Sequence, residues 1–163
     1  MSNARKILIL IPPGSCDAAY LLQWTCSNFF HRPQDTLFLV TGPALLIQGR
    51  VHSENYQDDL DKVITDFRER EATIGRNIPD DLTFNKTVLN SNTESKDMNQ
   101  ALQEFVKNVH PDILVIDGHD LEELKKAGVW QGSFSKFCVN QLKTHVIVVR
   151  HPSDDTHHHH NPH

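Results

Sequence analysis

Two groups of residues in this sequence combine side chains that could do chemistry. The first is the pair Gly132-Ser133, with Ser135 close behind, at the start of a stretch with helical spacing. Glycine and hydroxyl groups at a helix N-terminus suit a phosphate group, because free backbone N–H groups and the helix dipole attract anions there. The same residues also make an ordinary helix N-cap. The segment therefore predicts a phosphate site or a capped helix, and both interpretations stay open.

The second group is Asp117, His119 and Asp120, which come at the end of an apolar run. Two carboxylates and an imidazole could bind a divalent metal ion or position a water molecule for hydrolysis. Polar residues of these types are also common in turns, where an Asp side chain bonds the backbone two residues on. We favour the turn interpretation and assign no catalytic residue and no metal ligand, with hydrolysis kept as an alternative.

Five short runs predict the strands that position these groups. Four are apolar throughout, as expected for strands buried on both faces of a sheet, and one alternates, as expected at a sheet edge. In chain order they cover residues 6–11, 36–41, 82–89 (the alternating run), 112–117 and 145–150. Apolar residues at helical spacing predict helices at 16–30, 56–76, 98–109 and 132–142. Ser15 is the expected N-cap of the first helix, and residues 42–56 are expected to form a connecting loop.

This alternation of strands and helices predicts an α/β fold, with an open, five-stranded parallel sheet covered by helices on both faces. The chain length of 163 residues fits one domain, which we place at residues 1–152. The His-rich tail at 153–163 has no residue that could join a core, and we expect it to be disordered.

The composition disfavours several classes of partner. The net charge is −5 and no cluster of lysine and arginine is present, whereas nucleic-acid binding needs a basic surface. No apolar run approaches the ~18 residues that span a bilayer. Cys16, Cys26 and Cys138 show no paired spacing, which fits a reducing compartment. We therefore expect a cytoplasmic protein that binds neither nucleic acid nor membrane.

Three stretches carry a resemblance to the universal stress protein family (UspA-like domains). They are KILILIPPGS at residues 6–15, DILVIDG at 112–118, and GSFSKFCVNQLKTHVIVVR at 132–150. In element order the resemblance spans residues 5–152. It implies a Rossmann-like sheet of strand order 3-2-1-4-5, as in adenine nucleotide alpha hydrolase-like folds. It also implies a homodimer built through the last strand, His145 to Arg150.

The implied strand order reverses between the first and fourth strands, and open α/β sheets bind ligands in the crevice at such a point. The resemblance implies that an adenine nucleotide, ATP with Mg²⁺, binds there. The implied contacts come from the turn after the first strand, the end of the second strand and the two segments around the last helix. They are Pro12, Pro13, Val40, Gly118, Gly132, Ser133, Phe134 and Ser135.

The ATP-binding pattern of the family is incomplete in this chain. Family members that bind ATP carry G-x-x-G followed nine residues later by G-[ST]. Gly118 and Gly132-Ser133 match the two ends, but Leu121 replaces the middle glycine and the spacing after it is one residue longer. Pro13 stands where the family places an aspartate near the nucleoside, and loss of such a hydrogen bond costs about 1–3 kcal/mol.

Three functions are therefore considered. The first is an adenine-nucleotide-binding regulatory or stress-response module without strong catalytic activity. The second is a relative that no longer binds ATP and acts as a dimerising protein-interaction module. The third is a phosphohydrolase that uses Asp117, His119 and Asp120.

Overall fold

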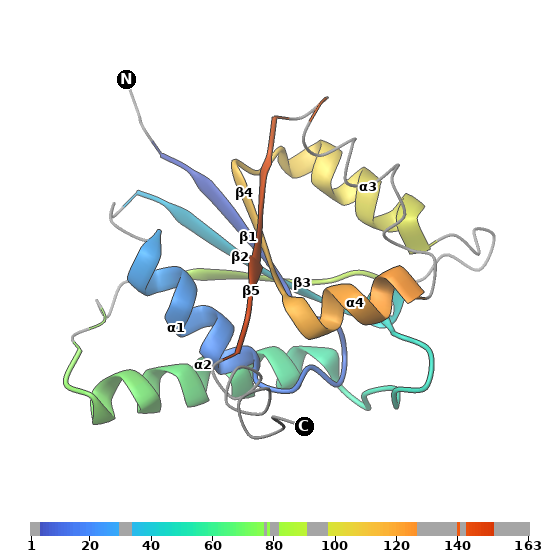
Figure 1. The fold of residues 1–163 in the computed structure, drawn as a ribbon. Helices are drawn as coiled ribbons and strands as arrows, with labels where there is room; N and C mark the ends of the chain where they lie inside the picture. The colour runs from blue at the N-terminus through green and yellow to red at the C-terminus, as the bar shows by residue number, and fades with distance from the viewer. Residues whose placement is uncertain are drawn as a thin grey trace, which may run out of the picture.

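The computed structural model describes residues 4–29, 34–76, 78, 82–90, 98–126, 140 and 143–151. Strands and helices alternate along the chain (Figure 1). The strands are β1 (Lys6–Leu10), β2 (Thr36–Thr41), β3 (Phe84–Val88), β4 (Ile113–Asp117) and β5 (His145–Val149). The helices are α1 (Ala18–Asn28), the short 3₁₀ helix η1 (Pro43–Leu45), α2 (Tyr56–Thr73), α3 (Met98–Val109) and α4 (Gly118–Lys126).

The five strands form one parallel sheet of order β3-β2-β1-β4-β5. This confirms the predicted fold class and the predicted strand order. The central strands β1 and β4 are apolar and almost entirely buried, because helices cover both of their faces. The alternating strand β3 lies at one edge, as its half-polar pattern predicts.

Successive residues of the central strands point to opposite faces of the sheet and so build two cores. Ile7 and Ile9 of β1 pack on the face covered by α1 and α2, where Phe67 is fully buried. Leu8 and Leu10 pack on the opposite face, against apolar residues of α3 and α4. Figure 1 shows the two pairs of helices on the two sides of the sheet. The chain therefore leaves β1 toward one face and leaves β4 toward the other.

A buried ion pair fixes the register of β1 against β2 at the amino end of the sheet. The side chain of Asp35 is inaccessible to solvent and accepts hydrogen bonds from Arg5 Nε (3.2 Å), Arg5 Nη2 (2.8 Å) and the Arg5 backbone N–H (3.0 Å). Lys6 then pairs with Thr36. A bidentate arginine–carboxylate contact forms only in a restricted geometry, so it holds the two strands in one register.

The structure corrects three local predictions. Helix α1 begins at Ala18 and is capped by Asp17, not by Ser15. The predicted loop at 42–56 contains η1, which starts at Pro43. The segment after β4, expected to be a polar turn, is the helix α4, although the Asp117 side chain does bond the backbone two residues on, as expected. The predicted helix at 132–142, apart from residue 140, and the predicted disordered tail lie outside the described residues. In the described part of the chain, no helix is both long and apolar enough to cross a membrane.

Candidate functional site

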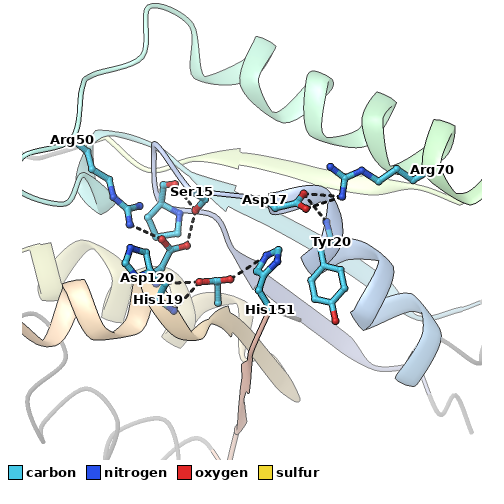
Figure 2. Close-up of polar contacts among 10 residues, drawn as sticks. Ser15, Asp17, Tyr20, Arg50, Arg70, His119, Asp120 and His151 are labelled. Carbon is cyan, nitrogen blue, oxygen red and sulfur yellow. Dashed lines mark hydrogen bonds and ion pairs between the residues drawn. The ribbon is translucent and has the colours of Figure 1, made fainter. Parts of the chain in front are cut away.

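The strand order reverses between β1 and β4, and open α/β sheets bind ligands in a crevice at the carboxyl ends of such strands. We call this place, at the carboxyl ends of β1 and β4, the crevice. Two segments meet there: the turn that follows β1, Pro12 to Ser15, and the start of α4. Because α1 and α4 lie on opposite faces, the connections diverge and leave the strand ends between them. Figure 2 shows the polar side chains that gather at this point.

The turn after β1 folds tightly and directs a hydroxyl toward α4. The backbone N–H of Ser15 donates to the carbonyl of Pro12 (3.1 Å). The Oγ atom of Ser15 lies 2.8 Å from that carbonyl oxygen and donates to Asp120 Oδ2 at 2.6 Å. Gly14 between them has φ +78°, a conformation that favours glycine, so the turn can close. Ser15 therefore links the turn to α4 instead of capping α1.

Helix α4 follows β4 without a loop, and Asp117 caps it. Asp117 Oδ1 accepts from the backbone N–H groups of His119 (2.8 Å) and Asp120 (3.2 Å). Backbone N–H groups at a helix start are what binds phosphate in many nucleotide sites, and here two of them are bonded to the chain's own carboxylate. Leu121, where the family pattern has glycine, is 7% exposed and belongs to the core under α4.

Asp120 is the centre of the site. It is 1% exposed, and its two carboxylate oxygens face different partners: Oδ2 meets Ser15, and Oδ1 lies 2.8 Å from Arg50 Nη2. Figure 2 shows the contacts from Ser15 and Arg50 meeting at this carboxylate. Burial raises the pKa of Asp120, since removal from water penalises the charged form, and the nearby Asp117 charge adds to this. The Ser15 hydrogen bond and the Arg50 charge act in the opposite direction.

Arg50 is the one site residue that comes from the segment predicted to be a plain loop. Its side chain is 16% exposed, and its Nη1 donates to the carbonyl of Pro13 at 3.2 Å. A Cβ atom added to Gly14 would lie 3.0 Å from Arg50 Cδ, so glycine at this position lets the arginine stem pass over the turn. Nothing in the local sequence distinguishes Arg50 from a solvent-exposed arginine, because its partner Asp120 lies far along the chain.

His151 closes the other side of the crevice, just after β5. It is 9% exposed, its Nε2 lies 3.5 Å from Asp117 Oδ2, and its ring stacks at an angle on Tyr20 with centroids 4.5 Å apart. Beside Tyr20, the capping residue Asp17 accepts a hydrogen bond from Arg70 Nη1 of α2 at 2.9 Å. The end of β5 is thereby tied to β4 and to α1. No motif surrounds His151 in the sequence, so it was not predicted as a site residue.

The structure brings some of the predicted contact residues to the crevice. Pro12 and Pro13 are buried in the turn, and Gly118 lies half-buried at the start of α4. Val40 is fully buried in the core, and its carbonyl accepts from the Ile11 N–H at 2.8 Å. The remaining predicted contacts, Gly132, Ser133, Phe134 and Ser135, lie outside the described residues.

The three residues considered for hydrolysis do not converge on one point. Asp117 caps α4 and faces His151, Asp120 faces Ser15 and Arg50, and the His119 side chain is exposed at the mouth of the crevice. Among the described residues, no group of three or more His, Cys, Asp and Glu side chains is arranged to hold a metal ion.

No known protein-family model matches this chain, and no curated protein matches it.

Proposed function

We propose that this chain is an adenine-nucleotide-binding module of the universal stress type. Nucleotide binding then serves regulation in a stress response and not rapid catalysis. The observation that carries the proposal is the crevice between β1 and β4, with the turn after β1, the start of α4 and the Arg50 guanidinium around it. Open α/β sheets bind ligands at this point. Arg50 adds a permanent positive charge, which suits the phosphate groups of a nucleotide.

The phosphate end of the crevice supports the proposal better than the nucleoside end. Arg50 reaches the crevice over the exposed Gly14, so an anion can approach the guanidinium from the solvent side. At the nucleoside end, Pro13 supplies neither a carboxylate nor an N–H group. We therefore expect affinity to depend mainly on the phosphates and little on the base.

Mg²⁺ would enter together with the phosphates of ATP, because phosphate oxygens and water are its usual ligands. The two carboxylates nearest the crevice already have partners within the chain, Asp117 at the start of α4 and Asp120 at Arg50. We accordingly assign neither of them as a metal ligand.

The second candidate, an interaction module that no longer binds ATP, is favoured by one specific observation. Arg50 and the first N–H groups of α4, which would bind phosphate, both contact carboxylates of the chain itself. A ligand has to compete with these contacts. The dispersed positions of Asp117, His119 and Asp120 give no comparable support to a phosphohydrolase.

We also propose a homodimer through the last strand, His145 to Arg150, in the cytoplasm. Strand β5 is at the edge of the described sheet, and Val148 on it is 41% exposed. Cys16 and Cys26 are free thiols, which fits a reducing compartment. Light scattering should give a dimer mass for the wild type and a monomer mass for Val148→Lys. A monomer mass for the wild type at high protein concentration would contradict the dimer.

Isothermal titration calorimetry of the full chain with ATP and with AMP tests nucleotide binding. We expect heat of binding for the wild type and a loss of about tenfold or more in affinity for Arg50→Ala, since charge-assisted hydrogen bonds to phosphate are lost. The matched control is Arg68→Ala, which removes the same charge near the amino end of β3, where Arg68 bonds the Leu82 carbonyl. No heat from the wild type with millimolar nucleotide would contradict the proposed function.

A further inference from the structure

We propose that Arg50 and Ser15 form an anion-binding position which the carboxylate of Asp120 occupies in the free protein, and that the phosphate group of a ligand binds by taking the place of this carboxylate. The inference rests on the proposed function, because it specifies how the crevice binds the phosphate of a nucleotide. It also makes Asp120 the residue that sets the affinity and the pH dependence of binding.

The donor set around Asp120 is one that suits a phosphate as well as a carboxylate. A serine hydroxyl contacts one oxygen at 2.6 Å and a guanidinium nitrogen contacts the other at 2.8 Å. Guanidinium groups match the spacing of oxygens in both carboxylates and phosphates. Asp120 Oδ1 faces Arg50 at ion-pair distance and accepts no other hydrogen bond from a described residue.

The charge of Asp120 is held at a cost in free energy. The residue is 1% exposed and shares the crevice with a second carboxylate, Asp117. The groups that face this pair are Ser15 from the turn after β1, Arg50 from the segment after η1, and His151 after β5, which lies against Asp117. Burial raises the pKa of Asp120 above its ordinary value, so protonation occurs in less acid solution than for an exposed aspartate.

Protonation or displacement of Asp120 frees a positive charge that has access to solvent. The Arg50 side chain is 16% exposed, and its neighbour Gly14 is exposed with no side chain to block an approach. A neutral Asp120 no longer attracts the guanidinium or repels an incoming anion. Anion affinity of the wild type should therefore rise as pH falls through the pKa of Asp120.

The test uses sulfate and AMP as probes, with the full-length wild type, Asp120→Asn and the double variant Asp120→Asn/Arg50→Ala. Sulfate keeps the same charge across the pH range, so any change in its affinity comes from the protein. Asp120→Asn preserves the shape of the side chain without the charge and should bind both probes about tenfold to a hundredfold more tightly than the wild type at neutral pH. The double variant should lose this gain.

The same titrations at about pH 5.5 and about pH 7.5, on the wild type and Arg50→Ala, supply a second measurement that requires no stable Asp120 variant. The wild type should bind sulfate more tightly at the lower pH. Arg50→Ala retains every histidine, so its pH dependence reports their contribution, which is subtracted from that of the wild type.

The outcomes separate this inference from the proposed function. Nucleotide binding by the wild type, with no gain in Asp120→Asn and no pH dependence beyond that of Arg50→Ala, would overturn the inference and leave the function standing. Binding of sulfate and AMP by Asp120→Asn alone would support the inference and contradict nucleotide binding by the native chain. An absence of binding to every protein would overturn both.

Discussion

Gly42 at the end of β2 offers a quantitative test of how the carboxyl edge of the sheet is built. Its φ is +131°, and a Cβ atom added there would lie 2.3 Å from the Leu89 carbonyl oxygen and 2.6 Å from the Leu89 nitrogen. Both atoms are backbone atoms, and both are bonded: the Leu89 N–H donates to Thr41 O at 2.8 Å, and Leu89 O accepts from Ala44 N–H at 3.0 Å. The Cβ atom of Gly42→Ala would therefore clash with backbone atoms, which cannot move aside as a flexible side chain could.

The cost of Gly42→Ala has two contributions. A non-glycine residue in this backbone region costs of order 1–3 kcal/mol. Moving Leu89 away weakens two hydrogen bonds, each worth about 0.5–1.5 kcal/mol. The expected loss in the free energy of unfolding is thus about 2–6 kcal/mol, with about 4 kcal/mol as the central value. Because the segment from Gly42 leads through η1 to Arg50, the variant should also weaken ligand binding at the crevice.

Urea denaturation of Gly42→Ala and Gly75→Ala measures this difference. Gly75 also has a positive φ, +76°, but no atom lies within 4 Å of an added Cβ. Gly75→Ala should therefore lose only the backbone contribution, about 1–2 kcal/mol. Equal losses for the two variants, at unchanged denaturant slopes, would refute the argument that contact with Leu89 requires glycine at position 42.

Three further predictions concern single side chains. Asp17→Ala loses the cap on the Tyr20 N–H and should lower the free energy of unfolding by about 1–2 kcal/mol. Asp17→Asn retains this cap and loses only the half-exposed ion pair with Arg70, so it should cost less than about 1 kcal/mol. Equal losses for the two variants in urea denaturation would contradict this division. Burial and the charge of Glu71 raise the pKa of Cys26 to about 12, whereas Cys16 is exposed. Treatment with iodoacetamide followed by peptide mass mapping should therefore find Cys16 alkylated and Cys26 protected until the chain unfolds. Rapid alkylation of Cys26 in the native protein would contradict the burial argument. The pKa of Asp120 is raised in the folded state, so its contribution to the free energy of unfolding is present in acid and lost as pH rises through the folded pKa. The free energy of unfolding of the wild type should therefore fall relative to that of Asp120→Asn between about pH 4 and neutrality. A constant difference between the two proteins would show that the pKa is unshifted.

The strands were predictable from the sequence to within a residue or two. Uninterrupted apolar runs such as Ile7 to Leu10 have one stable place in a soluble protein, a strand covered on both faces. Their alternation with amphipathic segments then leaves a parallel sheet as the arrangement with short, right-handed connections. The strand order itself came from a family resemblance, because apolar runs of similar composition carry no information about which neighbours they take.

The helix starts were harder to predict, because capping residues are common. Ser15 and Asp17 are both good N-caps two positions apart, and local sequence does not choose between them. The Ser15 hydroxyl donates a hydrogen bond to Asp120 Oδ2, and this leaves Asp17 to cap α1. For α4 a signal was present: Asp117 as the cap, with Leu121 and Leu124 at helical spacing behind it. The polar residues between them favoured a turn in the sequence analysis.

The sequence by itself determined the class of fold, because hydrophobic periodicity and the ends of apolar runs are local properties. Only the tertiary structure decided which side chains meet at the carboxyl ends of β1 and β4. It brought Arg50, from the segment predicted to be a loop, and Ser15, from the turn after β1, onto the buried carboxylate of Asp120 at the start of α4. Contacts between residues so far apart depend on how the elements pack, and the buried charge acquires its raised pKa only when packing removes the surrounding water.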